Sequence, residues 1–245
     1  WSETRKKEIW DTFRDSIADA RKEQVDLLLI AGDLFHRQPL PQELKEVSYL
    51  FSTIPQTRVV LMAGNHDYLR PDSAYLSTTW SRNVACLFSR ECECVRFPEI
   101  GTEVYGLSYY RQEIPEPLYD GLHPVDSDCF QVLLAHGGDA LHIPFRKEKL
   151  ARSGFDYVAL GHIHKPQELA ENRVVYAGAL SPIDCGDTGP HGYVLGTWER
   201  GKVTVEFVPR AKREYAGLVL KVGEEDTTYS LRDRLERLIE KKGWQ

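Results

Sequence analysis

The chain has 245 residues, enough for one sizeable α/β domain or for a domain with part of a second. Hydrophobic residues make up 42% and charged residues 28%, as in soluble globular proteins, and no apolar stretch approaches the length of a membrane span. The formal net charge of −6 argues against a protein that holds nucleic acid by bulk electrostatics alone. It leaves room for a small phosphate site whose positive charge comes from metal ions.

The first expected element is a helix over residues 2–22, in which apolar residues recur with helical spacing and Ser2 could serve as the N-cap. Two short apolar runs follow, "VDLLLIAG" and "TRVVLMAG", and a second helical pattern near 41–52 lies between them. This alternation predicts βαβ units and therefore an α/β fold.

Later apolar runs, from "EVYGLSYY" to "KVTVEFV", lie closer together, as in hairpins or a meander. Loops rich in Pro, Asp and Gly at 111–128 and 181–192 either line a site or only connect strands. The stretch at 146–152 reads as a solvated helix face, and a charged helical pattern, "SLRDRLERLIEKK", closes the chain.

The five cysteines are odd in number and scattered, which suits reduced thiols in a cytosol better than a disulfide framework. Cys92 and Cys94 are two residues apart, but no second pair completes a thiolate metal site. We therefore interpret them as part of an alternating edge strand, and we expect a cytoplasmic protein.

Polar residues end several of the apolar runs, each beside a glycine that permits close backbone approach. Each has a simple structural explanation when taken alone, such as a turn, an Asx cap or a satisfied core histidine. Together they predict a metal site, because sites in open α/β sheets form beyond the carboxyl ends of the strands. The residues at these run ends are Asp33 with His36, then Asn65, His66 and Asp67, then His136, and finally His162 and His164.

The pair His162 and His164 follows the apolar run "FDYVAL". In extended backbone, residues two apart point to the same face, so we expect the two imidazoles to project together, with Ile163 facing the other way. A single H-x-H is weak evidence for a metal site, and only the other strand ends make it persuasive.

The motifs "GDLFH", "GNHD", "AHGG" and "GHIH", which cover residues 32–164, resemble in order and spacing those of the calcineurin-like metallophosphoesterases. The form "GDLFH" and the tail after residue 209 resemble the DNA-repair nuclease branch called SbcD in bacteria. The resemblance implies a two-sheet α/β/β/α sandwich. The domains would be a metallophosphoesterase (nuclease) domain over 1–208, lacking its first strand, and the start of a capping domain or C-terminal extension over 209–245.

The resemblance also implies a ligand set for two divalent metal ions. Asp33 would bridge both ions, Asn65, His136 and His162 would complete the second, and His164 would contribute to the first. One carboxylate has two oxygens, enough to hold two cations about 3.5–4 Å apart, as two-metal hydrolases need. Oxygen and nitrogen ligands without cysteine suit Mn²⁺, Fe or Zn²⁺, and Mn²⁺ is the usual activating ion of the nuclease branch.

Further roles follow from the same resemblance. His66 would stabilise or protonate the leaving oxygen, a role that suits an imidazole at neutral pH. Asp67 would orient His66 or, equally well, serve a structural turn, and His36 would be a histidine on the substrate side. Three cations directly follow motifs and are candidates for contacts with DNA phosphates, with plain solvated charge as the alternative: Arg37, Arg70 and Lys165.

One motif of the family is not found in the chain. The Asp-x-His at the end of the family's first strand should precede Trp1, and without it the first metal keeps only Asp33 and His164. We therefore expect that the sequence is an N-terminally incomplete record of a longer protein.

These observations favour a manganese-dependent hydrolase acting on DNA, a repair exonuclease or endonuclease subunit of the SbcD kind. Such proteins work with an SMC-like ATPase of the SbcC type and commonly form homodimers, and no membrane association is expected. One alternative is a metallophosphatase or a small-molecule phosphodiesterase on the same scaffold. Another is a non-catalytic scaffold module that lacks the first metal.

Overall fold

The computed structural model describes residues 3–126 and 128–243, so the predicted N-cap Ser2 lies outside the described residues. Three of the four predicted helical stretches are α1, which spans Glu3–Lys22, α2, which spans Pro41–Ser52, and α4, which spans Lys147–Ala151. α3 (Ala74–Ser77) and a 3₁₀ turn (Pro98–Ile100) are short additions.

Eleven strands are present in the described part of the chain, and they form three sheets. A parallel three-stranded sheet has the order β1 (Leu27–Ala31), β2 (Arg58–Met62) and β3 (Val84–Cys86). A mixed six-stranded sheet has the order β4 (Glu93–Phe97), β5 (Thr102–Gly106), β6 (Phe130–His136), β7 (Tyr157–Gly161), β9 (Val174–Tyr176) and β8 (Gln167–Ala170). The strands β10 (Gly192–Glu199) and β11 (Lys202–Pro209) form an antiparallel hairpin.

The first sheet has a core on each of its faces. Along β2, Val59 and Leu61 belong to the core shared with α1 and α2, whereas Val60 and Met62 belong to the core shared with the six-stranded sheet. This alternation follows from the two-residue period of a strand, and both faces are apolar because both are covered.

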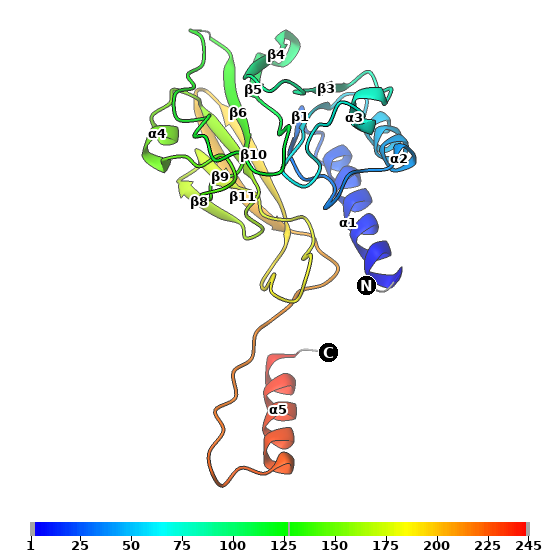
Figure 1. Ribbon diagram of the computed structural model, residues 1–245, viewed down its shortest axis with the longest axis vertical. Helices are drawn as coiled ribbons and strands as arrows, with labels where there is room; N and C mark the ends of the chain where they lie inside the picture. The colour runs from blue at the N-terminus through cyan, green and yellow to red at the C-terminus, as the bar shows by residue number, and fades with distance from the viewer. Residues whose placement is uncertain (1–2, 127, 244–245) are drawn as a thin grey trace.

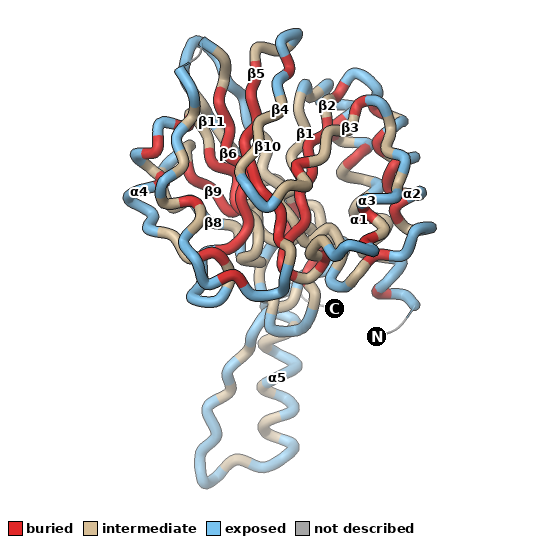
Figure 2. The backbone as a smooth tube through the Cα atoms, turned by 45° about the horizontal axis from the view of Figure 1, so that its top comes forward, coloured by how far each residue is buried: buried red, intermediate tan, exposed pale blue. Residues whose placement is uncertain are grey.

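The six-stranded sheet behaves in the same way. On β6, Val132 and Leu134 face the three-stranded sheet, while Leu133 and Ala135 face an outer core that also contains Leu150 of α4. Figure 1 shows α1, α2 and α3 on one side of the molecule and α4 on the other, and Figure 2 shows the buried strands between them. The predicted α/β/β/α sandwich is confirmed.

The chain leaves this main body a few residues after β11, beyond Tyr215. It runs without regular structure to α5 (Thr228–Lys242), which has no buried residue and hangs apart from the sheets in Figure 1. Thr227 caps the helix by accepting a 3.2 Å hydrogen bond from Ser230 N, and Gly243 ends it in the left-handed conformation at φ 66°. The predicted charged helix is present, and the domain boundary at 208/209 stays a prediction.

Candidate metal centre

The carboxyl ends of β1 and β6 meet at a buried histidine. His136 is fully buried, and its Nδ1 donates a 2.7 Å hydrogen bond to the carbonyl oxygen of Ala31. This bond fixes the ring so that Nε2 faces the loops beyond the strands. The close approach requires Gly32, because a Cβ at that position would lie 2.6 Å from His136 Nδ1.

Four side chains from four strand ends converge here. The amide oxygen Oδ1 of the buried Asn65 lies 2.9 Å from His136 Nε2 and 3.0 Å from His162 Nδ1. Asp33 Oδ2 is 3.2 Å from His136 Nε2, and one ligand atom each of Asp33, His136 and His162 lie within 4.8 Å of one another. Two oxygens and two imidazole nitrogens at this spacing fit a divalent ion with mixed oxygen and nitrogen ligands.

The backbone is strained at two of these four residues. Asp33 has φ 49° and His162 has φ 93°, a left-handed region that costs a side-chain-bearing residue about 1–3 kcal/mol. Such conformations persist where the surrounding structure imposes them, and they concentrate at functional sites. The strain aims both side chains into the same space.

The charges at the centre are linked. Burial opposes ionisation of Asp33, but His136 and the backbone N–H of His66, which donates a 2.8 Å bond to Asp33 Oδ1, lower the pKa of the carboxyl to about 2. Burial disfavours protonation of His136, yet Asp33 and the bond to Ala31 outweigh it and raise the pKa of the ring. Burial lowers the pKa of His162. Asp33 is therefore ionised at neutral pH, as a metal ligand must be.

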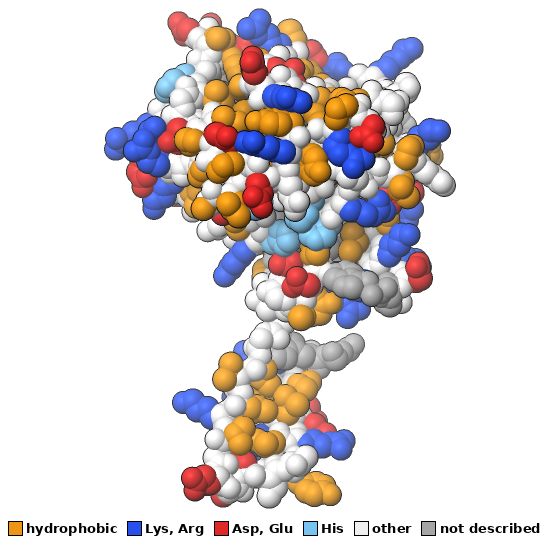
Figure 3. Space-filling view, viewed as in Figure 1, with side chains coloured by type: hydrophobic (Ala, Val, Ile, Leu, Met, Phe, Trp, Pro, Cys, Tyr) orange, Lys and Arg blue, Asp and Glu red, His pale blue; other side chains and the backbone are white. Residues whose placement is uncertain are grey.

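Two further histidines border the centre. The rings of His36 and His66 lie with centroids 4.0 Å apart and planes tilted by 32°. His66 is partly buried, which lowers the pKa of its ring, whereas His36 is exposed. The predicted pair of substrate-side histidines is thus close in space. Figure 3 shows histidine side chains gathered in one patch on the lower part of the main body.

Of the two roles left open for Asp67, orienting His66 or serving a structural turn, its contacts favour the structural one. Its fully buried carboxylate accepts hydrogen bonds from Gly64 N at 2.7 Å, Phe35 N at 3.2 Å and Tyr75 Oη at 2.6 Å, and not from the ring of His66. Burial raises the pKa of this carboxyl to about 6. Asp67 ties the loop after β1 to the loop after β2, so we assign it a positioning role.

The extended backbone expected for the H-x-H pair is not found. β7 ends at Gly161, and the positive φ of His162 turns the chain out of the extended conformation. His162 points to Asn65 with Nδ1, whereas His164 Nδ1 lies 2.9 Å from Asp187 Oδ2. His164 is outside the group of metal-capable side chains around Asp33.

The structure adds three residues that the sequence interpretation missed. Asp139 accepts from both His142 and His162 at 2.8 Å, and these three side chains form a second group with metal-ligand spacing. Asp187 pairs with His164. The only signal in the sequence was position: Asp139 directly follows "AHGG", and Asp187 lies in the polar loop 181–192.

The three predicted DNA contacts are not equivalent. Arg37 forms an ion pair with Glu43 at 2.5 Å and Arg70 with Asp72 at 3.2 Å, so both positive charges are compensated within the chain. Lys165 is exposed and has no ion pair with the described residues.

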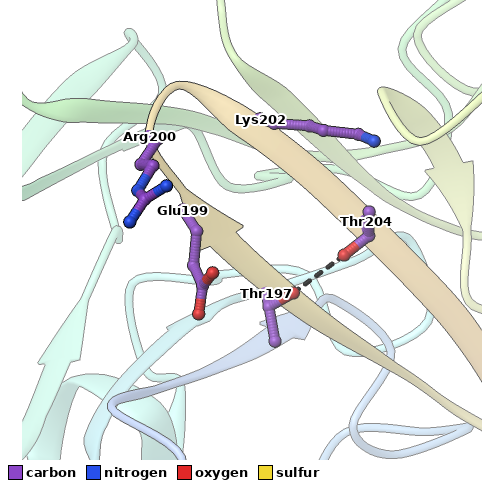
Figure 4. A pocket seen from close by; sticks show the side chains of 5 residues that line it. All are labelled: Thr197, Glu199, Arg200, Lys202 and Thr204. Atoms are coloured by element: carbon purple, nitrogen blue, oxygen red, sulfur yellow. Dashed lines mark hydrogen bonds between the residues drawn. The ribbon is translucent and has the colours of Figure 1, made fainter.

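A surface hollow of about 350 Å³ lies elsewhere, at the tip of the β10–β11 hairpin. Figure 4 shows that the side chains of Thr197 and Thr204, joined by a 2.8 Å hydrogen bond, and those of three charged residues line it. None of the centre's residues lines this hollow.

Comparison with known families places the chain. Residues 6–166, more than half of the 245, match the family described as calcineurin-like phosphoesterase. The chain belongs to this family. Its members are metallophosphoesterases that use divalent metal ions, and Asp33, His136 and His162 supply a group that could hold one. The resemblance seen in the motifs is confirmed.

Individual relatives are similar at moderate identity. An uncharacterized metallophosphoesterase, YhaO, of Bacillus subtilis is 30% identical over 218 residues, covering 82% of this chain and 52% of its own length. The DNA double-strand break repair protein Mre11 of Haloferax volcanii is 31% identical over 86% of this chain and 46% of its own length. The protein of the same name from Halobacterium salinarum is 26% identical over 96% and 63%. The chain thus spans about half the length of the curated relatives it matches. Among the described residues, no helix is both long enough and apolar enough to cross a membrane.

Proposed function

We propose that the protein is a two-metal phosphodiester hydrolase that acts on DNA, with Mn²⁺ as the activating ion. The observation that carries the proposal is the convergence of Asp33, Asn65, His136 and His162, whose ligand atoms lie 2.9–3.2 Å from one another in neighbouring pairs, beside the adjacent rings of His36 and His66. Asp33 would be shared by the two ions. His164 would contribute to the first of them.

Divalent ions held here supply positive charge that polarises the phosphate and lowers the pKa of water. The side chains of the chain then divide the remaining work. Asn65 binds without adding negative charge, which helps an anionic diester to approach. His66 lies beside Asp33 with its backbone fixed by the 2.8 Å bond to that carboxylate, so its ring can donate a proton to the leaving oxygen.

An open strand edge supports a further part of the proposal. Among the described residues β1 pairs with β2 only, and all five of its apolar residues are just partly buried, whereas four of the five in β2 are buried. A strand that carries the expected Asp-x-His motif would pair with this edge and bring its two side chains beside Asp33. These side chains would complete the first metal site.

The DNA substrate rests on similarity to relatives named as DNA double-strand break repair proteins. By the same reasoning we propose a repair exonuclease or endonuclease of the SbcD kind that works with an SMC-like ATPase and forms a homodimer. A phosphatase or small-molecule phosphodiesterase is the rival, because the relative YhaO is an uncharacterized metallophosphoesterase and the four-residue cluster would serve any phosphoester.

Mn²⁺-supported hydrolysis of a linear DNA duplex and of an aryl phosphate distinguishes these functions. The natural full-length protein should be used. We expect cleavage of the duplex to exceed hydrolysis of the monoester, and we expect Asn65→Ala to abolish both. His123→Ala is the matched control, because His123 bonds the carbonyl oxygen of Ser153 and not the centre. A preference for the monoester would favour the phosphatase, and a metal-loaded but inactive protein would favour a scaffold.

A further inference from the structure

His162 has a carboxylate partner that is itself held in place. Oδ1 of Asp139 accepts hydrogen bonds from Leu141 N at 2.8 Å and His142 N at 3.0 Å, which is a local Asx turn. Oδ2 of the same carboxylate lies 2.8 Å from His162 Nε2. A carboxylate can only accept, so Nε2 of His162 donates to Asp139, and Nδ1, which lies 3.0 Å from the amide oxygen of Asn65, is the nitrogen that faces the other ligand atoms of the centre.

His164 has a partner of the same kind on another loop. Oδ2 of Asp187 accepts a 2.8 Å bond from Ile183 N and lies 2.9 Å from His164 Nδ1, with Oδ1 at 3.0 Å from the same nitrogen. Nδ1 of His164 therefore donates, and Nε2 is the nitrogen left with a lone pair. The two histidines present opposite nitrogens.

Because the two histidines donate to their carboxylates through different ring nitrogens, they can bind different metal ions although they are only two residues apart. A metal ligand must offer an unprotonated nitrogen, and a neutral imidazole has one. We propose that Asp139 and Asp187 are positioning residues that fix opposite tautomers of His162 and His164, so that one presents Nδ1 and the other Nε2 to the metal centre. The inference rests on the proposed metal-dependent function.

The backbone hydrogen bonds to Asp139 and Asp187 distinguish these two contacts from ordinary exposed ion pairs. The side chain of Asp139 is 45% exposed, and an exposed ion pair contributes little when both partners are mobile. Backbone N–H groups hold both carboxylates, however, and backbone strain holds His162, so their hydrogen bonds need little further ordering. Such outer partners orient the ligand and raise its basicity, and their loss typically weakens metal affinity about 10- to 100-fold.

Nitrogen-15 NMR of the imidazole rings tests the tautomers directly in metal-free protein at pH 8. We expect His162 as the Nε2–H form and His164 as the Nδ1–H form. Asp139→Ala should abolish the preference at His162 alone, and Asp187→Ala at His164 alone. His142→Ala should leave His162 unchanged, because it removes another partner of Asp139 while the carboxylate stays in its turn. Identical tautomers for the two histidines in the unchanged protein would overturn the inference.

Calorimetric titration with Mn²⁺ alone gives the second readout. We expect affinity to fall about 10- to 100-fold for Asp139→Ala and for Asp187→Ala. We expect partial recovery for Asp139→Asn, which keeps an acceptor oxygen. Asp184→Ala is the matched control, since Asp184 lies in the same loop as Asp187 and bonds Gly186 N instead of a histidine. Unchanged affinity in both alanine variants would reject the role.

The two readouts keep failures apart. If the unchanged protein binds no divalent ion, the proposed function fails, and the NMR result still decides whether the carboxylates set the tautomers. If it binds Mn²⁺ and the tautomers do not depend on Asp139 and Asp187, only the inference fails. Asp139→Asn keeps the shape of the side chain, so it decides the case if the alanine variant unfolds.

Discussion

At the scale of the residue, the single side chain of Asp33 connects the ends of separate strands. Its Oδ1 accepts the backbone N–H of His66 from the loop after β2, and its Oδ2 lies 3.2 Å from the ring of His136 at the end of β6. Its positive φ of 49° is the strain that allows both contacts at once. One carboxylate therefore fixes the relative position of three elements before any metal ion binds.

His66 should affect the reaction and not the metal content. We expect His66→Ala to lower phosphodiester hydrolysis by about 10² to 10⁴-fold, because a proton donor in the transition state contributes that much. Metal content should stay the same, since the ring of His66 lies outside the group formed by Asp33, His136 and His162. Metal analysis and a nuclease assay on the same sample measure both. Near-normal turnover would remove His66 from the mechanism.

The three cations near the centre should differ in importance for DNA. Lys165→Ala should raise the KM for duplex DNA and reduce the slope of log affinity against log salt by about 1, as expected for a lost phosphate contact. Arg70→Ala should do neither, because Asp72 already compensates that charge. Steady-state kinetics at several salt concentrations measure these slopes, with an aryl phosphate as the substrate that both variants should treat alike. Equal effects of the two substitutions would contradict the distinction.

Sequence patterns predicted the metal-ligand candidates at the strand ends better than the carboxylates that hydrogen-bond to them. Asn65, His136 and His162 could be found because each follows an apolar run, so strand topology alone brings them together. Asp139 and Asp187 could not be found, because their contacts depend on where two irregular loops fold. The turn of the chain at His162 was missed for a similar reason, because nothing in "GHIH" indicates a positive φ at a histidine.

At the scale of the element, helix α1 is joined to the segment after β11 by ion pairs. Arg210 pairs with Asp19 at 2.5 Å, Lys212 pairs with Asp15, and Arg213 pairs with Glu8 at 2.8 Å. The helix and the strands themselves were readable from apolar periodicity. This charged connection was not, because residues 191 to 205 positions apart in sequence form it.

Glu8 should make the stability of this connection depend on pH. Its hydrogen bond to Arg213, followed by that to Arg5, lowers the pKa of Glu8 from 4.5 to about 2. A depressed folded-state pKa gives stability that is fully present above pH 4.5 and is lost as the pH falls toward 2. We expect Glu8→Gln to lower the free energy of unfolding by about 1 kcal/mol at pH 7, a modest value because solvent reaches the pair.

Urea unfolding at pH 7, 4 and 2.5 measures the difference, which should shrink at each step. Glu46→Gln serves as the control. Glu46 of α2 pairs with Arg14 of α1, the helix that also carries Glu8, and not with the segment after β11. A difference between Glu8→Gln and the unchanged protein that stayed constant across this range would show that the carboxylate does not titrate with the connection.

At the scale of the whole molecule, the main body and the C-terminal helix are distinct in their contacts. Among the described residues, the last hydrogen bond from the tail to the main body joins Gly189 N to the carbonyl oxygen of Tyr215 at 2.9 Å. Beyond it, the bonds of Arg234 reach only Asp226 and the carbonyl oxygen of Lys221. The contacts of the main body thus extend to residue 215, a few residues past the boundary predicted at 208/209.

Removal of residues 216–245 should therefore leave the main body as stable as before. No residue of α5 is buried, and Val219 and Tyr229 are 88% and 87% exposed, so the deletion uncovers almost no apolar surface of the sandwich. We expect the free energy of unfolding to change by less than about 0.5 kcal/mol, as for surface changes that touch no core contact. Urea unfolding of the 245-residue chain and of its first 215 residues measures this.

Hydrogen exchange gives an independent view: the amides of α5 should exchange far faster than those of β6, because the helix can open without disturbing the sheets. A large loss of stability, or exchange of α5 as slow as that of β6, would mean that the helix packs on the main body in solution and that the boundary near residue 215 is wrong.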